Sequence, residues 1–267
     1  MQRYVWLSDT HLNLSVLPFL KRLFVSRLKS ARPDGVFITG DISIGLGVEF
    51  DLRFLARNFD CPIYFVLGNH DYHLRYISSV HSDMSRLTRE VDHLHWMTEE
   101  STLSLSPGVA LIGTEGWYDA RMGDPKYLRW TSDWMLTFDF LQQHNMEERL
   151  ETWRAMAQKS ADEITVKLEN ALQRHSTVYL MTHFPPWREA TRGEGTLLER
   201  YWMPYNTNDA MGQAIEKVMA NHPTSRVIVL AGHTHNPCYI HVSDTIECRV
   251  ARASYWGPVS DEGTIVI

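Results

Sequence analysis

Tyr64-Phe-Val-Leu-Gly-Asn-His-Asp71 is the stretch from which the organisation of this chain is best understood. It lies across the end of a short apolar run, residues 63–67, whose composition predicts a buried β-strand. Gly68 then allows a sharp turn at the carboxyl end of that strand. Ligands in open α/β sheets bind outside the carboxyl ends of the strands, so the polar side chains after Gly68 indicate a metal or proton-transfer site. The other interpretation is an ordinary turn, in which Asn and Asp are common.

Four other predicted strands end in residues of the same kind. Those residues are Asp9 and His11 after residues 5–8, Asp41 after 36–39, His183 after 178–182, and His233 and His235 after 227–230. Together with Asn69 they give seven potential ligands, namely two carboxylates, one amide and four imidazoles. Nitrogen and oxygen donors without thiolate suit Mn, Fe, Zn, Co or Ni. Seven ligands are too many for one ion, and they suit two ions about 3.5 Å apart that share a carboxylate.

The alternation of strands and helices predicts the fold class. Residues 1–71 follow the order strand, helix, strand, helix, strand, which is typical of βαβ units around a parallel sheet, so we expect an α/β fold. A Pro-Gly pair at 107–108 predicts a turn between two short strands of an antiparallel extension or a second sheet. Apolar periodicity predicts a helix over residues 151–174, and Asn208 is expected to cap another helix that ends near Met219.

Residues 114–135 depart from this pattern. Aromatic and basic side chains crowd together there, and glycine and proline interrupt regular structure. The aromatic members are Trp117, Tyr118, Tyr127, Trp130 and Trp134. We interpret the segment as a functional loop or cap. Its rings either stack on a nucleobase or another ring of a ligand, or form the core of the cap.

The composition fits a soluble globular protein with one large domain or two small ones, since 44% of the 267 residues are hydrophobic and 22% are charged. No apolar run approaches the ~18–20 residues that span a membrane, and no secretory signal is recognised. The formal net charge of −6 gives no sign of a general nucleic-acid-binding surface. Cys61, Cys238 and Cys248 fit neither a disulfide framework nor a zinc finger, so we expect reduced thiols and a cytoplasmic location.

The combined motifs resemble those of the calcineurin-like metallophosphoesterase superfamily. They are D-x-H at residues 9–11, G-D at 40–41, G-N-H-D at 68–71, a single His183 and G-H-x-H at 232–235. Each motif is weak alone, but the set is highly specific and extends over nearly the whole chain. The resemblance implies one domain over residues 1–267 that folds as a two-sheet αββα sandwich. It also leads us to expect an aromatic-rich helical or loop cap, or an insertion, at residues 114–175.

The resemblance further implies a role for each motif residue. Asp9, His11 and His235 would hold the first metal ion, Asn69, His183 and His233 would hold the second, and Asp41 would bridge the two. The ions would be divalent or trivalent transition metals, and a hydroxide that bridges them would attack phosphorus in line. His70 would be the catalytic histidine, which donates a proton to a phosphoryl oxygen or to the departing alkoxide. Asp71 either orients His70 or caps the start of a helix.

Differences within the superfamily narrow the expected substrate. The phosphoprotein phosphatases of this superfamily have a motif that resembles G-D-x-V-D-R-G. The matching stretch of this chain is Gly40-Asp-Ile-Ser-Ile-Gly45, which lacks the Asp-Arg pair. The combination of G-N-H-D with G-H-T-H looks more like the phosphodiesterase and small-phosphoester branch. We therefore expect hydrolysis of a soluble phosphodiester or phosphomonoester, with nucleotides among the candidate substrates.

Trp117, Arg121 and Arg188 are the candidates for substrate binding. Trp117 stands in the aromatic segment, where it could stack on a ring of the substrate. The two arginines, like Arg192, could clamp a second phosphate or an anionic leaving group. The alternative interpretation for each arginine is a solvated surface side chain.

Two other functions compete with this prediction. A nuclease of the same superfamily usually carries a basic DNA-binding element, and no basic stripe is visible here, so nucleic acid is not the favoured partner. A non-catalytic scaffold on the same fold would have lost ligands, yet all seven are present. The native metals, the choice between monoester and diester, and the oligomeric state stay open at the level of sequence.

Overall fold

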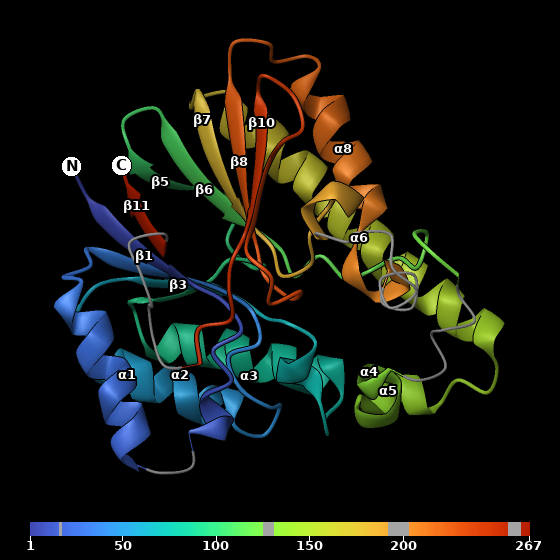
Figure 1. The fold of residues 1–267 in the computed structure, drawn as a ribbon, viewed down its shortest axis with the longest axis horizontal. Coiled ribbons are helices and arrows are strands. Elements are labelled where there is room, and N and C mark those ends of the chain that lie inside the picture. The colour runs from blue at the N-terminus through green and yellow to red at the C-terminus, as the bar shows by residue number, and fades with distance from the viewer. Residues whose placement is uncertain (16–17, 125–130, 192–202, 256–262) are drawn as a thin grey trace.

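Two β-sheets lie face to face between two layers of helices (Figure 1). The computed structural model describes residues 1–15, 18–124, 131–191, 203–255 and 263–267. The αββα sandwich that the sequence motifs imply is therefore the observed fold. Among the described residues, no helix has both the length and the apolar character that crossing a membrane requires.

The first sheet has the strand order β11-β1-β2-β3-β4. Its parallel strands are β1 (Arg3–Leu7), β2 (Gly35–Thr39), β3 (Ile63–Val66) and β4 (Leu94–Trp96). At its edge, β11 (Thr264–Val266) pairs antiparallel with β1, so the two chain ends lie side by side. The predicted βαβ arrangement of residues 1–71 is confirmed, because β1, β2 and β3 are successive parallel neighbours.

The second sheet has the strand order β5-β6-β7-β8-β10-β9. Its parallel strands are β6 (Val109–Gly113), β7 (Thr177–Met181), β8 (Arg226–Ala231) and β10 (Ile246–Val250). The edge strands β5 (Leu103–Ser106) and β9 (Cys238–His241) run antiparallel to their neighbours. The predicted turn at 107–108 joins β5 to β6, and it belongs to a second sheet rather than to an extension of the first.

Side chains alternate between the two faces of each strand, so the strands contribute to two cores. Trp6 points into the space between the sheets, where it joins a cluster with Met181 and Leu230 of the second sheet. Leu7 and Ile38 belong to a different cluster, which faces the outer helices. Burial on both faces explains why these strands are almost continuously apolar.

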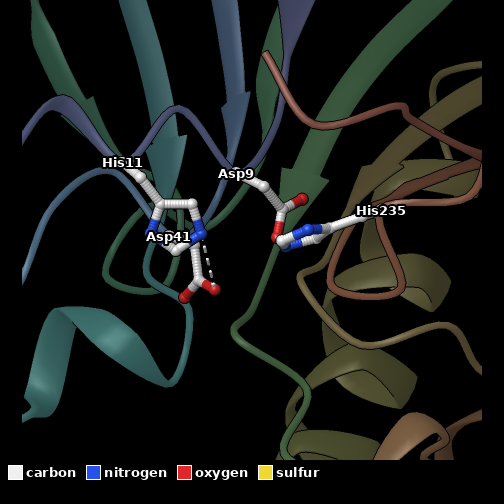
Figure 2. Close-up of side chains that lie close together, drawn as sticks. All are labelled: Asp9, His11, Asp41 and His235. Atoms are coloured by element: carbon white, nitrogen blue, oxygen red, sulfur yellow. Dashed lines mark ion pairs between the residues drawn. The ribbon is translucent and has the colours of Figure 1, made fainter. Parts of the chain in front are cut away.

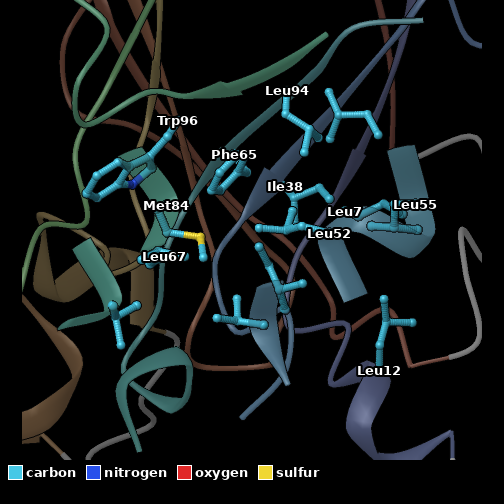
Figure 3. Close-up of a cluster of buried hydrophobic side chains, with 14 of the residues drawn as sticks. Leu7, Leu12, Ile38, Leu52, Leu55, Phe65, Leu67, Met84, Leu94 and Trp96 are labelled. Atoms are coloured by element: carbon cyan, nitrogen blue, oxygen red, sulfur yellow. The ribbon is translucent and has the colours of Figure 1, made fainter. Parts of the chain in front are cut away.

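The outer face of the first sheet is covered by α1 (Pro18–Ser30), α2 (Val48–Ala56) and α3 (Ile77–Glu90) (Figure 1). Figure 3 shows the resulting cluster, in which Leu52 and Leu55 of α2 and Met84 of α3 pack with Ile38 and Phe65 of the strands. Full burial of each such side chain stabilises the fold by roughly 1.5–3 kcal/mol. This packing holds the carboxyl ends of the strands in fixed positions.

The outer face of the second sheet is covered by α6 (Met146–Leu172) and α8 (Asp209–Met219). Each helix is preceded by an asparagine N-cap whose side chain accepts a hydrogen bond from a first-turn backbone N–H, at 2.9 Å for Asn145 and 3.0 Å for Asn208. The predicted cap at Asn208 is confirmed. The other helix, α6, was predicted to start at residue 151. It starts earlier, at Met146, because the cap at Asn145 satisfies a backbone N–H of its first turn.

Between β6 and α6 the described residues form two short helices, α4 (Ser132–Leu136) and α5 (Phe138–Leu141), which lie near the amino-terminal end of α6 (Figure 1). The expected cap over residues 114–175 includes part of the scaffold, because the second half of α6 packs against β6 and β7. The described residues of that segment before α6, 114–124 and 131–145, form no strand of either sheet.

Trp117 and Tyr118, which precede α4, are buried and pack against Phe184. Of the two alternatives for the aromatic segment, these two rings follow the one in which they form a core. Neither ring is exposed, so neither can stack on a ligand. Tyr127 and Trp130 of the same segment lie outside the described residues.

Candidate metal centre

The seven predicted ligands lie at the carboxyl ends of parallel strands from both sheets. The first sheet supplies Asp9 and His11 after β1, Asp41 after β2 and Asn69 after β3, and the second supplies His183 after β7 and His233 and His235 after β8. A hydrogen bond joins the two sheets at this edge, since Nδ1 of His183 lies 2.8 Å from the carbonyl oxygen of Thr39. Both sheets therefore contribute side chains to one site.

The backbone at these strand ends is strained. Five of the seven ligands have positive φ angles, in the left-handed region that non-glycine residues rarely adopt. The values are 50° at Asp9, 41° at His11, 50° at Asp41, 68° at His233 and 59° at His235. Such conformations cost about 1–3 kcal/mol each and persist where the surrounding structure imposes them, often at functional sites. The sharp turns aim the side chains at a common point.

Two motif glycines are needed because ligands pack against their backbone. A Cβ atom at Gly232 would lie 2.7 Å from Oδ2 of Asp9, and one at Gly68 would lie 2.6 Å from the backbone nitrogen of Asp41. Real Cβ atoms essentially never approach other atoms within 3.0 Å. The glycines of G-N-H-D and G-H-x-H therefore make room for the ligands of the neighbouring strands.

The first group of ligands converges closely (Figure 2). Ligand atoms of Asp9, His11, Asp41 and His235 all lie within 4.8 Å of one another. Oδ1 of Asp9 lies 3.1 Å from Nε2 of His235, yet this buried oxygen has no hydrogen-bond partner among the described residues. A buried carboxylate oxygen without a hydrogen bond is costly, and a bound cation would satisfy it. The donors and the oxygen that lacks a hydrogen bond therefore fit a metal ion.

The second group meets the first at Asp41. Nε2 of His183 lies 3.5 Å from Oδ1 of Asp41 and 3.2 Å from Oδ1 of Asn69. The ring of His233 lies 5.1 Å from the ring of His183 between centroids. The other oxygen of Asp41, Oδ2, lies 3.7 Å from Nε2 of His11 in the first group. The two oxygens of one carboxylate thus face different ligand groups.

Partners on the far side of two rings leave the other nitrogen of each ring facing the cluster. A carbonyl oxygen only accepts, so Nδ1 of His183 donates to Thr39, and in the neutral ring the lone pair resides on Nε2. Nδ1 of His235 lies 3.0 Å from the hydroxyl of Tyr255, which leaves its Nε2 toward Asp9. Metal-binding histidines are commonly held in this way by a partner on the second nitrogen.

The pKa shifts follow from burial and from the mixed charges of the cluster. Burial alone would raise the pKa of Asp41, but the neighbouring His183 and His70 lower it. Burial would lower the pKa of His183, but the carboxylates of Asp41 and Asp9 raise it. Burial lowers the pKa of His233 to about 4, so this ring is neutral at physiological pH. The carboxylates are therefore ionised and at least one imidazole is ready to bind a cation.

His70 lies at the edge of the cluster. Its Nε2 lies 3.9 Å from Oδ2 of Asp41, and its side chain is 39% exposed, so a ligand could reach it. Its backbone N–H donates to Oδ1 of Asp41 at 2.9 Å. This position, next to the ligands but open to solvent, suits a group that contacts a substrate.

Asp71 connects two loops and makes no described hydrogen bond with His70. It is fully buried and accepts hydrogen bonds from the backbone N–H groups of Ser43 and Gly68, both at 2.9 Å, and of Ile42 at 3.2 Å. The hydrogen bonds of Asp71 therefore give no support to the expectation that it orients the ring of His70. Its carboxylate instead ties the loop that carries Asp41 to the loop that carries Asn69.

The three candidates for substrate binding lie in different environments. Trp117 is 4% exposed and packs against Tyr72, Phe140 and Phe184, which makes it part of the hydrophobic core. Its burial there leaves almost no surface for stacking on a substrate.

Arg121 and Arg188 are both on the surface. Nε of Arg121 lies 3.7 Å from Asp119, and the residue lines a groove of about 510 Å³ between α6 and α8 that contains none of the seven ligands. Arg188 begins the short helix Arg188–Thr191, follows the β7 ligand loop and is exposed. Arg192 lies outside the described residues.

Sequence reasoning missed three residues that contact the predicted ligands or His70. Asp133 accepts a hydrogen bond from the side-chain amide of Asn69, Tyr255 contacts His235, and His73 lies beneath His70 with ring centroids 4.5 Å apart. None of the three follows a predicted strand. Of the three, only His73 stands near a motif, because it lies two residues after G-N-H-D.

Comparison with known proteins places the chain in a class. A family model described as calcineurin-like phosphoesterase matches residues 3–237. The chain belongs to the calcineurin-like phosphoesterase family, whose members typically bind divalent metal ions, and the cluster around Asp41 is the candidate site for them. No curated protein sequence is significantly similar to the chain.

Solved structures with low sequence identity share the fold. The phosphopantetheinyl hydrolase of Mycobacterium tuberculosis is 13% identical, with a TM-score of 0.65 over 94% of this chain and 89% of its own. A dimetal phosphatase from Danio rerio is 14% identical, with a TM-score of 0.58 over 96% and 89%. GAP50, described as the anchor in the inner membrane complex of Plasmodium, is 11% identical, with a TM-score of 0.50 over 99% and 77%.

Proposed function

We propose that this chain is a dinuclear metal-dependent phosphoesterase that hydrolyses a soluble phosphodiester or phosphomonoester. The observation that carries the proposal is the position of the Asp41 carboxylate, whose Oδ2 faces His11 at 3.7 Å and whose Oδ1 faces His183 at 3.5 Å. A carboxylate between two sets of ligands is the arrangement that a two-metal site requires. Membership of the phosphoesterase family supports the same reaction class.

The donor set defines which residues would hold the ions. Asp9, His11 and His235 would bind one, Asn69, His183 and His233 the other, and Asp41 both. Mixed imidazole, carboxylate and amide donors suit Mn, Fe, Zn, Ni or Co. When bound, two such ions supply positive charge for the phosphoryl group and lower the pKa of water enough to make it a nucleophile at neutral pH.

The protein itself supplies orientation and a proton donor. The sharp turns at the strand ends and the hydrogen bonds to the far nitrogens of His183 and His235 hold the donors before any ligand arrives. His70 is open to solvent beside the cluster, so its imidazolium would donate to the leaving-group oxygen. General-acid catalysis of this kind contributes roughly 10²–10⁴-fold.

The substrate would be a small phosphoester, with nucleotides as candidates. Arg188 is exposed on the short helix that follows the β7 ligand loop, and it would attract a second anionic group of the substrate.

The location of the protein would be the cytoplasm. The described cysteines Cys61, Cys238 and Cys248 are all free thiols, as in proteins of a reducing compartment such as the cytoplasm.

A screen with two chromogenic substrates tests the proposal. Bis-p-nitrophenyl phosphate and p-nitrophenyl phosphate are offered to the metal-free protein with Mn²⁺, Ni²⁺, Zn²⁺ or Mg²⁺, followed by nucleotides. We expect turnover that depends on an added transition metal and is abolished by a chelator. Tight binding of two ions without turnover of any phosphoester would instead favour a scaffold on this fold.

A further inference from the structure

Asp133 brings a buried carboxylate from the first turn of α4 to the edge of the metal cluster. It is 3% exposed, and both of its oxygens have partners. Oδ1 accepts a hydrogen bond of 2.7 Å from the side-chain amide of Asn69 and lies 2.8 Å from Nε2 of His73, while Oδ2 accepts one of 3.2 Å from the hydroxyl of Tyr118. An ionised carboxylate only accepts hydrogen bonds, so each partner must present an N–H or O–H group to it.

The contact with Asp133 determines which atom of Asn69 faces the metal cluster. An asparagine side chain offers an oxygen on one side and an NH₂ group on the other, and only the oxygen can bind a cation. Because the NH₂ group is directed to Asp133, Oδ1 points the opposite way and lies 3.2 Å from Nε2 of His183. Without an acceptor at position 133, the amide would be free to turn its NH₂ group toward the cluster.

The same carboxylate fixes the ring of His73. Nε2 of His73 donates to Asp133 and the ring is 1% exposed, so it has little freedom to move. Its centroid lies 4.5 Å from that of His70, with a tilt of 42° between the planes. The exposed ring of His70 therefore rests on a ring that Asp133 holds in place.

We propose that Asp133 is a positioning residue that sets the second metal site by orienting the Asn69 amide and supports His70 through His73. The inference rests on the proposed two-metal function. Its consequence is that α4, which comes from the irregular segment between β6 and α6, completes a site whose ligands all come from strand ends. Metal binding and the docking of this segment are thereby coupled.

Titration with Mn²⁺ tests the proposal without reliance on activity. Asp133→Ala removes the acceptor, so we expect second-site affinity to fall by about 10–100-fold while first-site affinity is unchanged. Calorimetry measures both sites, and electron paramagnetic resonance of Mn²⁺ reports loss of the spin coupling between two neighbouring ions. If Asp133→Ala does not fold, Asp133→Ser takes its place, because its short hydroxyl cannot reach Asn69 and His73 together.

Two further variants separate orientation from general damage. Asp133→Asn can keep an oxygen toward Asn69 while its NH₂ group donates to Tyr118, so we expect second-site binding close to that of the wild type. Asp119→Ala removes another buried carboxylate of the same segment, which accepts backbone hydrogen bonds from Arg121 and Ala210 at 2.9 and 3.0 Å. It should lower stability yet leave both metal sites intact.

The outcomes distinguish failure of this inference from failure of the proposed function. Two-site binding in the wild type with unchanged binding in Asp133→Ala would overturn the positioning role alone. Equal weakening of both sites in Asp133→Ala, or a loss in Asp133→Asn as large as in Asp133→Ala, would also overturn it. A wild-type protein that never binds a second Mn²⁺ would overturn the two-metal proposal and the inference with it.

Discussion

Oδ1 of Asp41, from the first sheet, lies 3.5 Å from Nε2 of His183, from the second. The contact crosses the boundary between the sheets at the edge where their parallel strands end. The second oxygen of the same carboxylate faces His11 instead. The place where the sheets meet is thus also the place where the two groups of predicted ligands meet, and neither sheet alone supplies the whole set.

Replacement of Asp41 by asparagine should damage both halves of the site. An amide has one oxygen and no charge, so it cannot replace a carboxylate that binds two cations. We expect Asp41→Asn to lower turnover by at least ~10²-fold and to weaken the binding of both ions. Metal analysis and p-nitrophenyl phosphate kinetics measure the two effects. Asp51→Asn is the matched control, because Asp51 is an equally buried carboxylate that pairs with Lys21 outside the cluster. Full metal occupancy with near-normal turnover in Asp41→Asn would contradict the bridging role.

His70→Ala should harm chemistry and spare metal binding. We expect two bound ions and a kcat lower by ~10²-fold or more for a substrate with a poor leaving group such as a ribose alkoxide. The loss should be smaller for p-nitrophenolate, which departs without a proton. Comparison of the two substrates is the test, and an equal loss for both would indicate electrostatic stabilisation rather than proton donation. A missing ion in this variant would mean that His70 is a ligand.

The substitution Trp117→Ala should act on stability rather than on substrate choice. Trp117 is a core side chain, and its truncation to alanine should lower the free energy of unfolding by about 3–5 kcal/mol. Thermal denaturation of the metal-free protein measures this loss.

Arg188→Ala is the contrasting variant, since replacement of an exposed side chain changes the free energy of unfolding by no more than about 0.5 kcal/mol. A raised KM for anionic substrates in Arg188→Ala would support the proposal that Arg188 binds an anionic group of the substrate. Kinetics identical to those of the wild type on every substrate would contradict that proposal.

The convergence of the predicted ligands could be anticipated from sequence because each follows a predicted apolar strand. The pattern of apolar run, turn and polar ligand repeats five times, and parallel strands bring such positions to one edge of a sheet. The alternation of strands and helices likewise predicted the βαβ units. Asp9, Asp41 and Asn69 were thus accessible to local reasoning.

The contacts of Asp71, Trp117 and Asp133 were not predictable in the same way. Each depends on which distant segment packs against the residue, and the chain separates Asp133 from Asn69 by 64 positions. Asp71 stands beside His70 in sequence, but its carboxylate turns toward the backbone of the neighbouring loop. An aromatic residue such as Trp117 has the same sequence signature in a core and in a binding surface, and only the burial distinguishes them.

Metal affinity should fall as the pH falls. The nearby carboxylate of Asp9 raises the pKa of His235, and those of Asp41 and Asp9 raise the pKa of His183, so both rings hold a proton more tightly than a free imidazole. A ring must lose that proton to bind a metal, and below its pKa each ring reduces affinity by up to ~10-fold per pH unit. Calorimetric Mn²⁺ titrations between about pH 6 and pH 8 should show weaker binding and more proton release at the acid end. Affinity that is constant over this range would contradict the role of these histidines as ligands.

Anomalous diffraction from crystals loaded with Mn²⁺ tests the two-metal site most directly. We expect two peaks ~3–4 Å apart. One should lie among Asp9, His11 and His235, the other among Asn69, His183 and His233, with the carboxylate of Asp41 between them. A single peak at full occupancy, or two peaks that do not share Asp41, would contradict the dinuclear centre.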